Sequence, residues 1–93
     1  MERMKIKPSA LRTLNAVEAM LLANGNIYNG CKDPEEVICN AVNSDEVTGT
    51  HMNSEGSASS FLASLASEHA EGGPITTGDL LDIYRNPPYP DFF

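Results

Sequence analysis

Apolar residues recur at helical spacing in four segments of the chain, near residues 9–24, 34–43, 57–71 and 77–85. In the first segment the apolar positions share one arc of a helical wheel. Its members are Ala10, Leu11, Leu14, Val17, Leu21 and Leu22. The pattern predicts a mostly α-helical fold, a small single-domain bundle of about four short helices.

Local signals mark the starts of two of these helices. Asp33 precedes Pro34, which is typical of an N-cap followed by proline at the first helical position. Two glutamates come next, where the positive end of the helix dipole favours them. The run from Thr76 to Asp79 resembles a capping box, with aspartate in place of glutamate. These signals support the helical interpretation independently of the apolar spacing.

Two connections show no helical signal. Residues 27–32 contain one Asn-Gly pair and follow another at 24–25, so they are compatible with one minor β-hairpin and equally with an irregular connection. Residues 44–56 have no sustained period, so we expect a surface loop there. A loop of that length in a small domain is typical of a functional or mobile segment.

The core must be built mainly from aliphatic side chains, because the 93 residues include no tryptophan. We expect Phe61 to be the main aromatic ring of the interior. The spacing predicts a common core of Leu14, Val17, Leu21, Val37, Ile38, Phe61, Leu62, Leu65, Leu80 and Leu81.

The chain divides into three parts: a basic N-terminal arm at 1–8, the helical domain at 9–86 and a C-terminal tail at 87–93. The tail contains three prolines, so we expect it to be extended and polyproline-like. It also carries Tyr89, Phe92 and Phe93. Two interpretations remain open, because these rings can cover the protein's own core or insert into a pocket of a partner.

Charge is distributed unevenly along the sequence. Thirteen acidic residues outnumber six basic ones, giving a formal net charge of −7, and four of the six bases lie in the first twelve residues. Residues 13–93 therefore carry a formal charge of −10, from two bases and twelve acids. Such a body repels nucleic acid and phospholipid headgroups and attracts basic protein surfaces. We expect no direct nucleic-acid partner and no membrane partner.

The residues that could supply catalytic or metal chemistry do not form a recognisable motif. Cys31, Cys39, His51 and His69 are separated by 7, 11 and 17 residues, whereas zinc sites pair ligands at much shorter spacing. The chain contains no G-x-S-x-G nucleophile elbow, no P-loop ending and no calcium loop. His69 is expected at the edge of the core. We therefore expect no enzymatic activity, no metal and no cofactor.

Targeting and redox signals point to the cytoplasm. The first residues are polar and basic, without the apolar region of a signal peptide, and no apolar run is long enough to span a membrane. Two cysteines do not make a disulfide scaffold. The sequence therefore predicts a cytoplasmic protein with reduced cysteines.

Two function classes fit these observations. The first is an acidic protein-binding module that inhibits or regulates a partner through the partner's basic surface. Its composition is similar to that of nucleic-acid mimics and of small phage inhibitors of host defence systems, although no residue motif is matched. The expected contact residues are Glu35, Glu36, Asp45, Glu46, Glu55, Tyr89, Phe92 and Phe93. The second class is a structural or regulatory subunit, such as an antitoxin or assembly partner, whose helical faces complete a complex or a homodimer.

Overall fold

A computed structural model of the protein describes residues 7–24 and 33–88. They form four helices, α1 (Pro8–Asn24), α2 (Pro34–Thr48), α3 (Ala58–Ser67) and α4 (Thr77–Arg85), and these two stretches contain no strand. The predicted class, a small bundle of about four short helices, is confirmed. The hairpin considered at 27–32 lies outside the described residues.

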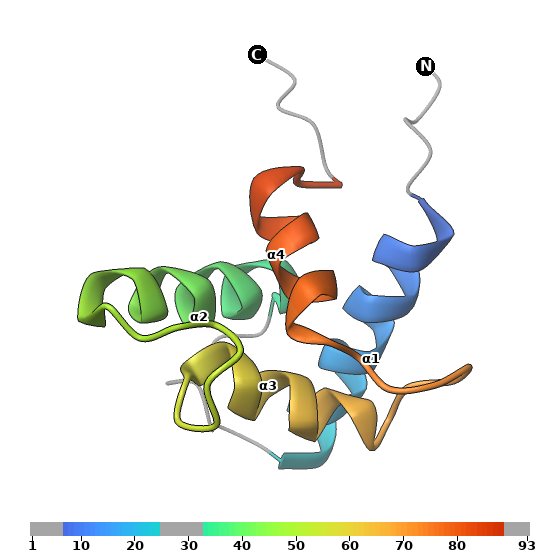
Figure 1. The fold of residues 1–93 in the computed structure, drawn as a ribbon. Helices are drawn as coiled ribbons and strands as arrows, with labels where there is room; N and C mark the ends of the chain where they lie inside the picture. The colour runs from blue at the N-terminus through green and yellow to red at the C-terminus, as the bar shows by residue number, and fades with distance from the viewer. Residues whose placement is uncertain (1–6, 25–32, 89–93) are drawn as a thin grey trace.

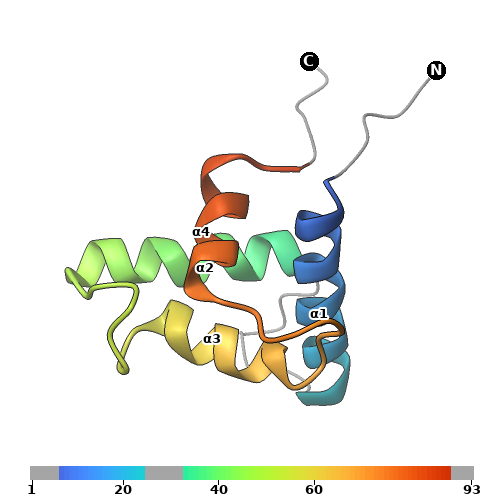
Figure 2. The same ribbon diagram turned by 45° about the vertical axis from the view of Figure 1, so that its right-hand side comes forward.

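The helices are arranged in two crossed pairs (Figure 1). α2 and α3 lie one above the other and are joined at one end by residues 49–57, whereas α1 and α4 stand steeply against them in both views (Figure 2). Every helix contacts the other three. Such mutual contact allows short helices, which are marginal in isolation, to be stabilised by packing.

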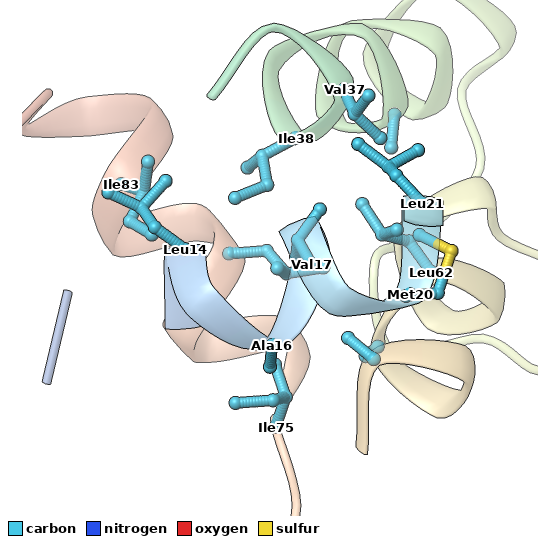
Figure 3. Packing of buried hydrophobic residues seen from close by; sticks show 14 of the residues in the cluster. Leu14, Ala16, Val17, Met20, Leu21, Val37, Ile38, Leu62, Ile75 and Ile83 are labelled. Carbon is cyan, nitrogen blue, oxygen red and sulfur yellow. The ribbon is translucent and has the colours of Figure 1, made fainter. Parts of the chain in front are cut away.

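The core lies where the four helices meet (Figure 3). Val17 of α1 faces Ile38 of α2, with Ile83 of α4 to one side and Leu62 of α3 to the other. Seven residues predicted for the core are buried: Leu14, Val17, Leu21, Val37, Ile38, Leu62 and Leu80. Met20, Ile75 and Ile83 are buried with them. The aliphatic character of the core therefore agrees with the prediction.

The prediction that Phe61 is the main interior ring is wrong, because 53% of this residue is exposed. The buried side of α3 instead contains Ser59, Leu62, Ala63 and Ala66. Small side chains therefore take most of the buried positions of α3, and the helix presents the Phe61 ring to its surface. The predicted core residues Leu65 and Leu81 are half-buried against the core.

Two leucines expected on the inner arc of α1 lie on its surface. Leu11 is 43% exposed and Leu22 is 83% exposed, whereas Thr13 and Ala16 are buried. The Thr13 hydroxyl donates to the Ser9 carbonyl oxygen at 3.0 Å, so its polar atom is satisfied inside the helix. A buried threonine of this kind contributes no signal to an apolar wheel.

α2 continues five residues past its expected end at 43, to Thr48. The prediction of a surface loop at 44–56 is therefore wrong for residues 44–48, which are helical. The helix stops at Gly49, whose φ of 75° is left-handed and whose N–H donates to the carbonyl oxygens of Asp45 and Glu46. The extension was missed because Asp45, at a buried helical position, replaces an apolar residue in the periodic pattern.

The connection between α3 and α4 is fixed at two points. α3 ends at Ser67, earlier than expected, and the Ser67 hydroxyl accepts from the Ile75 N–H at 2.8 Å. The Arg12 guanidinium of α1 donates to the carbonyl oxygens of Glu71, Gly73 and Pro74. Together these contacts hold the buried Ile75 in place just before α4 begins.

Both predicted N-terminal signals are confirmed in detail. The Asp33 carboxylate accepts from the Glu35 N–H at 3.0 Å. At α4, the Thr76 hydroxyl accepts from the Asp79 N–H at 3.1 Å, and the Asp79 carboxylate accepts from the Thr76 N–H at 2.9 Å. This reciprocal pair is a capping box.

Candidate functional site

The predicted contact residues differ in how far they are exposed to solvent. Glu35 is half-buried and Glu36 is exposed in the first turn of α2, and Glu46 is exposed near the other end of that helix. Glu55 is exposed in the connection between α2 and α3. The aromatic tail residues Tyr89, Phe92 and Phe93 lie outside the described part of the chain.

Asp45 is not available as a contact residue, since only 2% of it is exposed. One carboxylate oxygen accepts from the Ala58 N–H at 2.7 Å and the other accepts from the Ser59 N–H at 3.0 Å. These donors belong to the first turn of α3, where N–H groups lack partners within the helix and the dipole favours a negative charge. Asp45 therefore has a structural role: it fastens the end of α2 to the start of α3.

A row of polar side chains lies along one side of α2, and the last of them, Glu46, is bonded to α4. Glu35, Cys39 and Glu46 are spaced by four and seven residues, which places them on one side of α2. The Tyr84 hydroxyl of α4 donates to Glu46 Oε1 at 3.3 Å. We name these four residues the α2–α4 seam.

Two carboxylates, those of Glu35 and Glu46, place negative charge along the seam. The charge of Glu46 is the main reason that the pKa of Tyr84 lies above its ordinary value, with further contributions from burial and the hydrogen bond to Glu46. Burial, followed by the charges of Glu35 and Asp33, raises the pKa of the Cys39 thiol. Both shifts disfavour an additional negative charge. The seam therefore favours a cationic group over an anionic one.

Few bases are available to compensate these carboxylates. Within residues 7–24 and 33–88 there are eleven acidic side chains and three basic ones, namely Lys7, Arg12 and Arg85. Arg12 is engaged by the backbone carbonyls that follow α3. The other two bases lie at the start of α1 and the end of α4, and both are exposed.

An open hollow of about 400 Å³ adjoins the seam at the C-terminal end of α2. Glu46 belongs to both features, and Leu81 of α4 forms part of the opposite wall. We name this hollow the α2-end groove. It is lined by Asp45, Glu46, Gly49, Thr50, His51, Met52, Asn53 and Leu81.

A second hollow, of about 430 Å³, lies between α1 and the residues that follow α3. Arg12, Asn15 and Glu71 contribute its polar atoms, and three alanines form much of its wall. His69 is half-buried here, just beyond the end of α3.

Metal and membrane features were also assessed over the part of the chain that the structure describes. No group of three or more histidine, cysteine or acidic residues there could hold a metal ion. Cys39 is a free, half-buried thiol. None of the four helices is both long and apolar enough to cross a membrane.

Several residues of this region were not anticipated from the sequence. Tyr84 was not among the expected contact residues, yet its hydroxyl reaches a carboxylate 38 residues away. Met52 and Leu81 come together in the α2-end groove from different parts of the chain. No local pattern encodes such long-range pairs, because they depend on how α4 is placed against α2.

Comparison with known proteins gave no match: no family model, curated protein or solved structure is significantly similar to this chain. Function is therefore inferred from the residues of this protein alone.

Proposed function

We propose that this protein is a small acidic binding module that inhibits or regulates a partner protein by occupying the partner's basic surface. Where that surface contacts nucleic acid, the module competes for it as a mimic, in the manner of small phage inhibitors of host defence. The observation that carries the proposal is the negative seam between α2 and α4, with Glu46 held by Tyr84.

The contact residues of the proposal are Glu35, Glu36, Glu46 and Glu55, which span α2 and the connection after it. Carboxylates on a helix are presented with fixed spacing, as phosphates are along a nucleic acid. Complementary charge mainly accelerates encounter and selects the partner, whereas each exposed ion pair contributes only about 0–1 kcal/mol to affinity. Binding should therefore depend on the sum of these charges.

The proposal makes the protein a non-enzymatic regulator without a cofactor, acting in the cytoplasm of the producing or host cell. Its carboxylates repel phosphate groups, so nucleic acid is a competitor for the partner and not a ligand of this chain.

The test is affinity capture from the native host with a double charge reversal, Glu36→Lys together with Glu46→Lys. A matched control, Glu18→Lys with Glu68→Lys, changes the net charge equally at exposed positions of α1 and just after α3. Mass spectrometry identifies the captured proteins. A protein that the wild type and the control retain, and that the charge-reversed variant loses, would support the proposal. Equal retention by the two folded variants would reject an electrostatic contact at α2.

A second candidate function is a subunit that binds through an apolar surface, as an antitoxin or assembly partner does. It is favoured by the exposure of Leu22 (83%), Val47 (77%) and Phe61 (53%). An apolar interface should survive high salt, because screening weakens exposed charge pairs and leaves apolar burial intact. Sedimentation analysis of the complex with the partner at low and high ionic strength separates the two functions, because only the electrostatic complex should dissociate at high salt. Sedimentation of the protein alone reports any homodimer.

A further inference from the structure

We propose that the α2-end groove receives an arginine side chain of the partner, an inference that rests on the proposed function and names the group recognised. The groove lies at the C-terminal end of α2, where the helix dipole is negative. Glu46 adds a full negative charge at its rim. A cation placed there meets two independent sources of attraction.

Backbone hydrogen bonding also favours a donor as the ligand. The Gly49 N–H already donates to the carbonyl oxygens of Asp45 and Glu46, and the Thr50 N–H donates to the Asp45 carbonyl oxygen at 2.9 Å. Two backbone donors of the groove, the N–H groups of Gly49 and Thr50, are therefore used within the protein. An anion would find neither these donors nor a favourable field, whereas a guanidinium supplies five donors of its own.

The walls suit the aliphatic part of a long basic side chain. Met52 and Leu81 line the groove, and both are half-buried against the core. Arginine packs its methylene groups on apolar surface while its charged head stays with polar partners. A groove of about 400 Å³ can accept this stem together with the head group.

The protein itself contains an arginine that is held by several oxygen acceptors. Past the end of α3, the Arg12 Nε–H donates to the Glu71 carbonyl oxygen at 2.6 Å, and its Nη2 group also contacts the carbonyls of Gly73 and Pro74. Arginine suits such a site better than lysine, because its planar fork of donors engages several oxygens at once. The α2-end groove differs in its acceptor, which is the Glu46 carboxylate, because the Asp45 and Glu46 carbonyl oxygens already accept from Gly49 and Thr50.

The test uses Nα-acetyl-arginine methylamide as a probe and its neutral citrulline analogue as control, titrated into ¹⁵N-labelled protein at low salt. Saturable shifts at the amides of Gly49, Thr50 and Asn53, absent with citrulline, are expected. Glu46→Gln should weaken probe binding about three- to fivefold, as for loss of one exposed charge pair. Equal shifts with citrulline, or shifts spread over every acidic segment, would overturn the inference.

A steric variant separates this inference from the proposed function. His51→Trp fills the α2-end groove without adding a negative charge, and Ser64→Trp places the same ring on an exposed position of α3 as the control. His51→Trp alone should weaken partner binding at least about fivefold. If the partner is lost on reversal of Glu36 and Glu46 but tolerates His51→Trp, the groove inference fails while the proposed function stands.

Discussion

Replacing Asp45 with alanine should destabilise the protein more than any change of an exposed carboxylate. The substitution removes the acceptors of two N–H groups, at 2.7 and 3.0 Å, in the first turn of α3. Hydrogen bonds to a charged group are worth about 1.5–3 kcal/mol each, and release of a buried charge offsets part of the loss. We expect the free energy of unfolding to fall by about 2–4 kcal/mol, a large share of the stability of a small domain.

Two further variants make this prediction specific. Asp45→Asn keeps the shape and one acceptor oxygen, so we expect a smaller loss of about 1–2 kcal/mol. Glu46→Ala changes the neighbouring exposed carboxylate and should alter stability by less than about 0.5 kcal/mol.

Urea denaturation followed by circular dichroism at 222 nm measures all three variants, and unchanged m-values would validate the comparison. The amide resonances of Ala58 and Ser59 should shift in both Asp45 variants. A loss for Asp45→Ala as small as that for Glu46→Ala would refute the capping role.

Three other predictions concern the core, a buried hydroxyl and the seam. Leu62→Ala should lower the free energy of unfolding by about 2–5 kcal/mol, whereas Phe61→Ala should cost less than about 1 kcal/mol; urea titration that finds the reverse order would contradict the assigned face of α3. Ser59→Ala removes a fully buried hydroxyl that makes no hydrogen bond in the described structure. Thermal unfolding should therefore show a free energy of unfolding that is higher by up to about 1 kcal/mol, and a clear decrease would contradict the absence of a hydrogen-bond partner. Glu46→Gln should lower the pKa of Tyr84 toward 10.0, measured by ultraviolet titration against Tyr84→Phe. Because the folded pKa is raised, the stabilisation is present below pH 10 and is lost as pH rises through that pKa, and an unchanged titration would exclude Glu46 as the cause.

The sequence was informative where a structural signal is local. Asp33 with Pro34 and Thr76 with Asp79 located the starts of α2 and α4, because a cap joins residues only two or three positions apart. The apolar spacing likewise identified seven core residues. Asp45 was misread for a related reason: a buried carboxylate resembles a solvated one until the donors that satisfy it, 13 and 14 residues away, are known.

The candidate surface was only partly predictable for the same physical reason. Glu36, Glu46 and Glu55 are exposed, as the charge imbalance suggested. The contact of Glu46 with Tyr84 and its place in the α2-end groove depend on the packing of α4 on α2, which no periodicity specifies. Charge composition thus predicted that acidic side chains are exposed, whereas their placement relative to α4 required the fold.

The salt dependence of association with the captured partner tests the central claim most directly. Surface plasmon resonance at roughly 50 to 500 mM NaCl spans Debye lengths from well above 10 Å to below 8 Å, so exposed charges become screened within this range. The acidic-module account predicts that the association rate constant falls at least about tenfold, with a shallower slope for the Glu36→Lys, Glu46→Lys variant. An association rate that is independent of salt, with the same affinity for the charge-reversed protein, would contradict it.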